Sequence, residues 1–313
     1  MTAVNIKAFR GQIPRISERL LTSNHATRAL NCKITSGSLD PLAGIGQVFS
    51  TSLNIETVYR YRAFVNGAYA DNWLTWAEDV NIVPSPNAND PDGRFYFSSE
   101  SFEPRMSTYA LSISSTPYPT AWYSLGTAAP TVAPTVAHTG GSGATESRSY
   151  VYTYVTTFGE ESPPSPPSTV YTTYVNATWN LTALQTAPIN SGTITAASTI
   201  SSNTVRVTLN SVFGIAQYDT LTFSGVVGMT SLNGSFRVQS VDVANTRITV
   251  SLDTAQTYTS GGTWARNAPF NTTGMVKRIY RTVGTSGLFL YVGEVAVATT
   301  TYNDTVAAAD LGE

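Results

Sequence analysis

The residue types that most often carry out chemistry in proteins are scarce in this sequence. It holds two histidines, His25 and His138, and one cysteine, Cys32, among 313 residues. A serine–histidine–acid site needs a histidine held between a nucleophile and a carboxylate, and a zinc site needs Cys or His ligands at a fixed spacing. Neither pattern is present. We therefore expect no catalytic residue, no cofactor-binding residue, no metal ligand and no enzymatic activity, and a lone cysteine allows no intrachain disulfide.

Two short segments match functional motifs only in part. Asn89–Gly93 is similar to a calcium loop, but aligning Gly93 with the required glycine places Ala88 and Ser99 where carboxylates are needed. An Asp-Gly turn is therefore expected there. Gly140–Gly143 lacks the lysine and hydroxyl residue of a phosphate-binding loop, which favours a flexible linker.

Paired carboxylates are the remaining chemistry to consider, because two of them can cleave a polysaccharide. The candidates are Glu160 with Glu161, in a loop before a run of prolines, and Glu100 with Glu103, on either side of Phe102. Loop acids of this kind are expected to be solvated. A polysaccharide depolymerase therefore stays a less favoured alternative.

Composition separates this chain from several classes of protein. Charged residues make up 12%, about half of the ~25% that is typical of soluble proteins, and the net charge is −2. A general nucleic-acid binder is not expected from that charge. No apolar run approaches the ~20 residues of a membrane-spanning helix, and the first residues lack the layout of a signal peptide. A virion protein that is assembled in the host cytoplasm fits these properties.

The beginning of the chain is basic. Positive charges exceed the single acid, Glu18, over residues 1–33; they are Lys7, Arg10, Arg15, Arg19, Arg28 and Lys33. Such an arm can contact nucleic acid, contact an acidic protein surface or simply be solvated. We expect it to grip a neighbouring subunit.

Hydrophobic periodicity predicts a mainly β fold with several antiparallel sandwich or barrel modules, one inserted into another. The expected parts are an N-terminal arm (1–45), an antiparallel β unit (46–127), a split sandwich (128–189 and 267–313) and an inserted small barrel or sandwich (190–266). The arm is expected to be partly helical, with helices over Arg15–Leu21 and Ala26–Leu30. A strand is expected over Lys33–Leu39.

Turn residues and alternation locate individual strands. Asn66-Gly67 predicts a hairpin between Thr57–Val65 and Ala68–Ala77, whose aromatic side chains form a core or, alternatively, a platform for carbohydrate. In the split sandwich, Tyr150, Tyr152 and Tyr154 share one strand face. Pro163–Pro167 must lie in a loop or at an edge.

Strands of the inserted module are equally clear. Thr204–Leu209, Phe236–Val243 and Thr246–Leu252 alternate apolar and polar residues. Asn233-Gly234 predicts a turn.

Longer stretches resemble known families. Phe9–Arg15 with Ser36–Leu39 resembles the start of a family of tailed-bacteriophage virion proteins. Tyr152–Ser162 and Lys277–Arg281 resemble the two halves of a fibronectin type III-like sandwich found in those proteins.

The insert resembles a further β-module. Leu221–Gly234 with Tyr258–Thr263 is similar to the module named after the first catalytic-cysteine half-domain of ubiquitin-activating enzymes, which phage proteins often carry. The insert contains no cysteine, so that enzymatic role does not transfer.

The resemblance implies a structural protein of the tail nozzle or tail-tube type, a head-tail connector component. It implies a homo-oligomeric ring, with six copies expected, around a channel through which genomic DNA passes without specific binding. Implied partners are the portal, adaptor or other tail proteins, and tail fibres. A second reading is a receptor-binding or decoration protein on the virion surface that stacks sugars on Trp122 or Trp179.

Overall fold

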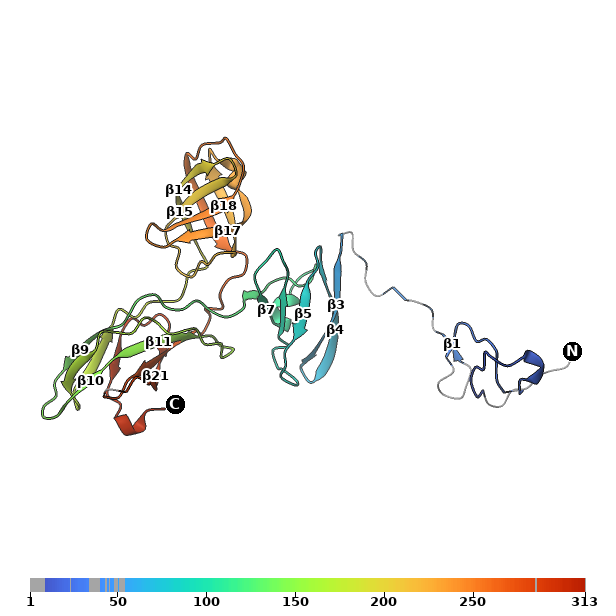
Figure 1. Cartoon of the computed structure of the whole chain (residues 1–313), viewed down its shortest axis with the longest axis horizontal. Coiled ribbons are helices and arrows are strands. Elements are labelled where there is room, and N and C mark those ends of the chain that lie inside the picture. The colour runs from blue at the N-terminus through green and yellow to red at the C-terminus, as the bar shows by residue number, and fades with distance from the viewer. Residues whose placement is uncertain are drawn as a thin grey trace. The chain divides into compact units, whose positions relative to one another are not determined.

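The computed structural model describes residues 9–22, 24–33, 40–42, 44, 46–47, 50, 54–284 and 286–312. The chain divides into two compact units, Met1–Leu53 and Asn54–Glu313. It is mainly β, with 43% strand and 5% helix, and has several antiparallel sheets and a closed barrel (Figure 1). The predicted fold class is confirmed.

The N-terminal unit has little regular structure in its described residues. A 3₁₀ turn, η1 (Glu18–Leu20), is followed by the paired strands β1 (Cys32–Lys33) and β2 (Asp40–Pro41). The helix expected over Arg15–Leu21 is therefore reduced to three residues. The helix expected over Ala26–Leu30 is wrong, because this segment is not helical and Ala26 forms a bridge with Gln12.

The reason is a lack of packing. Ile16, Leu20 and Leu30 are exposed, so neither segment has a covered apolar face. A helix this short is not stable without one. Of the strand expected over Lys33–Leu39, Lys33 lies in β1 and residues 34–39 lie outside the described residues.

A two-stranded and a four-stranded sheet follow in the second unit. Strands β3 (Thr57–Val65) and β4 (Ala68–Trp76) form the predicted hairpin, and Asn66 and Gly67 have the positive φ angles, 52° and 79°, that its turn requires. The four-stranded sheet has the order β5-β6-β7-β8. Its strands are β5 (Asn81–Pro84), β6 (Phe95–Ser98), β7 (Arg105–Ser107) and β8 (Tyr123–Ser124).

Aromatic side chains form the core of this part. Tyr61, Phe95, Phe97 and Phe102 are buried together with Leu74, which agrees with the predicted core. A short helix, α1 (Tyr109–Ser112), begins where the Thr108 side chain accepts a hydrogen bond from the Leu111 N–H.

The chain then forms a β-sandwich from two stretches of sequence. Its sheets are β11-β20-β21 and β22-β13-β9, with the pair β10-β12 beside them. The strands are β9 (Thr135–Thr139), β10 (Thr145–Arg148), β11 (Tyr150–Val155), β12 (Tyr171–Tyr174), β13 (Thr178–Thr182), β20 (Val276–Arg281), β21 (Leu290–Ala296) and β22 (Tyr302–Asp304). A 3₁₀ turn, η3 (Ala308–Asp310), follows.

The alternating tyrosines of β11 supply the sandwich core. Tyr150, Tyr152 and Tyr154 are fully buried in one cluster with Trp179 and Ile279, as the alternation predicts. Burying large aromatic side chains on one face removes much apolar surface from water.

The proline-rich segment protects the free edge of β11. The backbone N–H groups of Ser162, Ser165 and Ser168 donate to the carbonyls of Tyr154, Tyr152 and Tyr150, each at 2.9 Å. The same three serine hydroxyls accept from the tyrosine N–H groups at 2.9–3.2 Å. Prolines fill the positions between the serines, where no N–H is needed, so the repeat covers an edge without forming a regular ladder.

The inserted module is a closed six-stranded barrel with the order β14-β15-β18-β17-β16-β19 (Figure 1). Its elements are β14 (Ser191–Ser201), β15 (Thr204–Leu209), β16 (Thr220–Val227), η2 (Thr230–Leu232), β17 (Gly234–Asp242), β18 (Arg247–Ser251) and β19 (Ser260–Arg266). Val205, Val207, Ile248 and Val250 are buried inside it, which confirms the alternation. Closure leaves the barrel no free strand edge.

Candidate functional site: the module junction

The barrel is attached to the sandwich by a short stem. The stem consists of Asn190, where the chain enters the barrel, and residues 266–270, where the chain leaves it. The Asn190 side chain donates from Nδ2 to the Phe270 carbonyl at 3.0 Å, and its Oδ1 accepts from the Phe270 N–H at 2.8 Å. The Asn190 carbonyl also accepts from the Arg266 N–H at 2.8 Å. The incoming and outgoing chains are thus tied to each other where the barrel begins and ends.

Arg266 anchors the outgoing side of this stem. Its buried guanidinium donates from Nη1 to Asp219 Oδ2 at 2.8 Å and to the Gly214 carbonyl at 2.9 Å. Nε donates to the Ala268 carbonyl at 3.2 Å, and Cζ lies 4.2 Å from the centre of the Phe270 ring. Because the charge is paired and the donors are bonded, this arginine holds the stem in one geometry.

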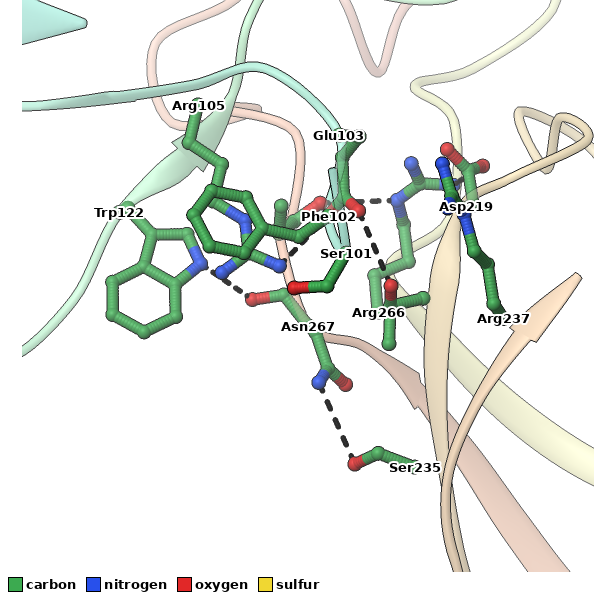
Figure 2. A network of polar contacts seen from close by, with 12 residues as sticks. Ser101, Phe102, Glu103, Arg105, Trp122, Asp219, Ser235, Arg237, Arg266 and Asn267 are labelled. Carbon is green, nitrogen blue, oxygen red and sulfur yellow. Dashed lines mark hydrogen bonds and ion pairs between the residues drawn. The ribbon is translucent and has the colours of Figure 1, made fainter. Parts of the chain in front are cut away.

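A second set of contacts joins the barrel and stem to the four-stranded sheet (Figure 2). The Trp122 indole N–H donates to the Asn267 carbonyl at 2.9 Å, and the Ser124 N–H donates to the Pro269 carbonyl at 2.9 Å.

Side chains of the barrel complete these contacts. Thr220 Oγ1 donates to Glu103 Oε2 at 3.3 Å, and Arg237 Nη1 donates to the Glu100 carbonyl at 2.9 Å. Hydrogen bonds are therefore donated across the junction both by the four-stranded sheet and by the barrel.

Arg105 lies in the same junction and is only 6% exposed. Its Cζ atom is 4.0 Å from the centre of the Phe102 ring and 4.8 Å from that of Trp122. Nη2 donates to Glu103 Oε1 at 3.4 Å, and Nε has no hydrogen-bond partner among the described residues. Burial lowers the pKa of Arg105 from its usual value, against the effect of Glu103. The rings of Phe102 and Trp122 stabilise the buried guanidinium of Arg105 through cation–π contacts, and they do so beside the stem.

A buried charge cluster closes the sandwich. Asp304 Oδ2 accepts from Tyr150 Oη at 2.7 Å and from Arg148 Nη1 at 3.2 Å, and it also pairs with Arg281 Nη1. Arg148 contacts Glu146 as well. Burial, followed by the charge of Asp304, raises the pKa of Tyr150. The groups pair with one another and form a structural clamp, although Arg281 Nε has no hydrogen-bond partner among the described residues.

Lys277 is the other buried cation of the sandwich. It is 0% exposed and donates from Nζ to the carbonyls of Thr299 at 2.5 Å and Leu184 at 3.4 Å. Burial lowers the pKa of Lys277 to about 8. Among the described residues, Nζ hydrogen-bonds to backbone carbonyls only.

The structure places the two histidines against hydroxyl groups. His25 Nδ1 lies 2.6 Å from Thr22 Oγ1, and His138 Nδ1 lies 3.0 Å from Tyr171 Oη. Cys32 is half-buried in β1. Neither histidine contacts a carboxylate in the described structure.

The carboxylates considered for sugar cleavage also form structural contacts. Glu161 accepts from Thr153, Tyr280 and Arg278 at 2.6, 2.5 and 3.0 Å. Burial alone would raise its pKa, but these bonds lower it below the usual value.

Glu160 differs, because burial raises its pKa despite a 3.3 Å bond from Thr156. Glu160 is therefore only partly solvated, whereas Glu161 is exposed as expected and also accepts structural hydrogen bonds. Glu103 is bonded within the junction, and the exposed Glu100 takes part through its backbone carbonyl.

The two tryptophans considered for stacking sugars are occupied inside the protein. Trp179 is 0% exposed in the sandwich core, with Arg148 4.2 Å from its ring centre. Trp122 is half-buried against Phe97 and bonded to the stem. Neither ring is free to serve as a sugar platform.

Asn89–Gly93 forms the predicted turn, in which the Gly93 N–H donates to the Asp90 carbonyl at 2.9 Å and Gly93 has a φ of 58°. Within the described ranges, no group of three or more His, Cys, Asp or Glu residues could hold a metal ion. The described helices include none that is long and apolar enough to cross a membrane.

Sequence reasoning did not find the junction or the charge cluster. A clue to the cluster was present in β20, where Lys277 and Arg281 occupy the same alternating positions as the buried Ile279. Charged residues on an inward face indicate buried pairs. The junction contacts join residues more than 100 positions apart, and no local pattern marks them.

No protein-family model matches the chain, and the search of curated proteins found no match.

Proposed function

We propose that this chain is a non-enzymatic structural component of a bacteriophage tail or neck, of the nozzle or tail-tube type. It acts through the interfaces between its subunits. Its partners are further copies of itself, the portal, adaptor or other tail proteins, and tail fibres. The resemblance in the sequence supplies the phage identity in this proposal.

The observation that carries the mechanical role is the junction between the modules. The barrel stem is tied at Asn190 and Arg266, and the adjacent sheet is tied to it at Trp122 and Ser124. Flexible linkers would let the modules move independently, whereas these directional contacts make them transmit load. A protein that must hold a fixed shape within an assembly benefits from such contacts.

Charge supports the same role. A ring closes when a head-to-tail interface repeats through a rotation that returns to its start. A channel with strong basic patches would retard DNA by attracting its phosphates, and this chain has a net charge of −2 with 12% charged residues. DNA can therefore pass without being retained.

Electron microscopy of the purified full chain, and of virions labelled with an antibody against it, tests this proposal. We expect closed rings, six-fold in class averages, and label at the tail or neck. A stable monomer that is absent from virions would overturn the proposal.

A receptor-binding or decoration protein is the second candidate. The observation in its favour is a cleft next to Tyr69, which is 56% exposed. A depolymerase gains no support, because Glu103, Glu160 and Glu161 are engaged in structural bonds.

A further inference from the structure

A cleft of about 150 Å³ lies between the β3–β4 hairpin and the loop that joins β5 to β6. This is below the roughly 300–1,000 Å³ of sites for drug-sized ligands, so it suits a single ring or the end of a chain. The lining residues that matter here are Tyr59, Arg62, Tyr69, Asn87, Asn89 and Arg94. None of them takes part in the module junction.

Aromatic surface is available at the rim of this cleft. Tyr69 is 56% exposed, although tyrosines of this unit such as Tyr61 are buried. Its ring is held by Phe64, with ring centres 5.1 Å apart, and by Arg62, whose Cζ is 4.4 Å from the ring centre. A fixed and exposed aromatic ring offers apolar contact area at a low cost in conformational entropy.

Amide groups stand next to this ring. Asn87 and Asn89 are exposed on the β5–β6 loop, and Tyr69 Oη donates to Asn89 Oδ1 at 3.4 Å. Asn89 has a φ of 54°, the left-handed conformation that asparagine tolerates in turns. Side-chain amides both donate and accept, so they match ligand hydroxyl groups.

Arg94 adds a partly used guanidinium on the inner side of the cleft. Its Nε donates to Asp90 Oδ2 at 2.7 Å, and its Nη atoms have no hydrogen bond within the described part of the chain. Burial alone would raise the pKa of Asp90, but bonds from Ser85 and Arg94 lower it below the usual value. Asp90 therefore stays ionised and fixes Arg94 in place.

Arg62 is the second guanidinium that lines the cleft, and Asp71 lies opposite it on β4. Two residues earlier on the same strand, Arg60 pairs with Asp71 at 3.0 Å. Arg62 forms no ion pair among the described residues and lies over Tyr69 instead. The charged residues that line the cleft are two arginines, Arg62 and Arg94, and one acid, Asp90, so the charge of the lining is positive.

We propose that this cleft binds a pyranose ring that carries a carboxylate. Tyr69 contacts the apolar face of the ring, Asn87 and Asn89 bond its hydroxyls, and Arg62 pairs with the carboxylate. A neutral sugar would leave the Arg62 charge unmatched, and a bare carboxylate would leave the ring and amides unused. This site is a further function that does not depend on ring assembly.

Ligand-observed NMR and calorimetry on the full chain test the proposal, with glucuronic acid, glucose and acetate as separate probes. We expect millimolar binding of glucuronic acid and weaker binding of glucose and acetate. Arg62→Gln should weaken glucuronic acid binding about tenfold, which corresponds to about 1.4 kcal/mol. It should weaken glucose binding much less, because glucose has no carboxylate and Arg62 then acts only by packing on the Tyr69 ring. Tyr69→Ala should weaken both sugars.

Arg28→Gln is the control, because it removes one exposed arginine charge outside the cleft. It should bind glucuronic acid as the parent chain does. Three results would overturn the proposal: no saccharide binding at millimolar concentration, acetate binding as tight as that of glucuronic acid, or an equal loss in Arg28→Gln and Arg62→Gln. Both arginine side chains are exposed, so both variants should fold.

Discussion

At the residue scale, Asp304 has the most demanding environment in the sandwich. It is 0% exposed and is shared by Tyr150, Arg148 and Arg281. Its second carboxylate oxygen accepts from the Val306 N–H at 2.9 Å. Two buried guanidinium groups therefore depend on this acid, although Glu146 also contacts one of them.

Asp304→Ala should lower the free energy of unfolding by about 3–5 kcal/mol, because it leaves buried cations without their partner. Chemical denaturation followed by tryptophan fluorescence measures this, since Trp179 lies in the same core. Asp71→Ala, which removes the acid of an exposed pair with Arg60, should leave stability unchanged. Equal losses in the two variants would contradict the clamp.

At the element scale, the serine–proline repeat of residues 162–168 lies along the edge of β11, where a further strand would otherwise pair. Ser162, Ser165 and Ser168 are buried, and the prolines between them are exposed. Three residues of the repeat match two residues of β11. The sequence indicated that this run lies in a loop or at an edge. It did not indicate that the serine hydroxyls would accept hydrogen bonds from the backbone N–H groups of the three tyrosines.

Ser165→Ala should destabilise the sandwich by about 1–3 kcal/mol, because the buried Tyr152 N–H loses the acceptor that lies 3.2 Å away. Equilibrium denaturation measures the loss, and amide exchange at Tyr152 should become faster. Ser142→Ala, in an exposed loop where only the backbone N–H is bonded, is the control. Unchanged exchange at Tyr152 would show that the hydroxyl is dispensable.

Elements that depend on local chemistry were predictable, and those that depend on packing were not. Asn66-Gly67 determined its hairpin because both residues accept positive φ, and alternation located Thr204–Leu209. The arm segment Ala26–Leu30 has helical propensity but no partner surface, so it did not become a helix. The Asp304 cluster joins residues 148, 281 and 304, which no local window contains.

At the scale of the whole molecule, hydrogen bonds at the junction link the barrel, its stem and the four-stranded sheet of the second unit. The Trp122 indole N–H donates to the Asn267 carbonyl in the stem. The Trp122 ring packs against the aromatic core that contains Phe95 and Phe97. These two contributions can be separated by mutation.

Trp122→Phe keeps an aromatic ring but removes the bond to the Asn267 carbonyl. We expect faster amide hydrogen exchange and faster limited proteolysis over residues 266–270, with little change in the melting temperature, because one bond of about 0.5–1.5 kcal/mol is lost. Trp73→Phe, in β4 and outside the junction contacts, should leave this segment unchanged. Identical exchange in both variants would mean that the stem is rigid without the sheet.

The stem of the barrel has a consequence for engineering. Because Asn190 hydrogen-bonds to Phe270 where the chain enters and leaves the barrel, the two ends of the insertion lie side by side at the sandwich. The barrel can be exchanged if its further contacts, such as Phe213 with Tyr154 and Thr220 with Glu103, are removed with it. A foreign domain whose termini lie close together can be grafted between Asn190 and Phe270, and the sandwich then becomes a platform for display.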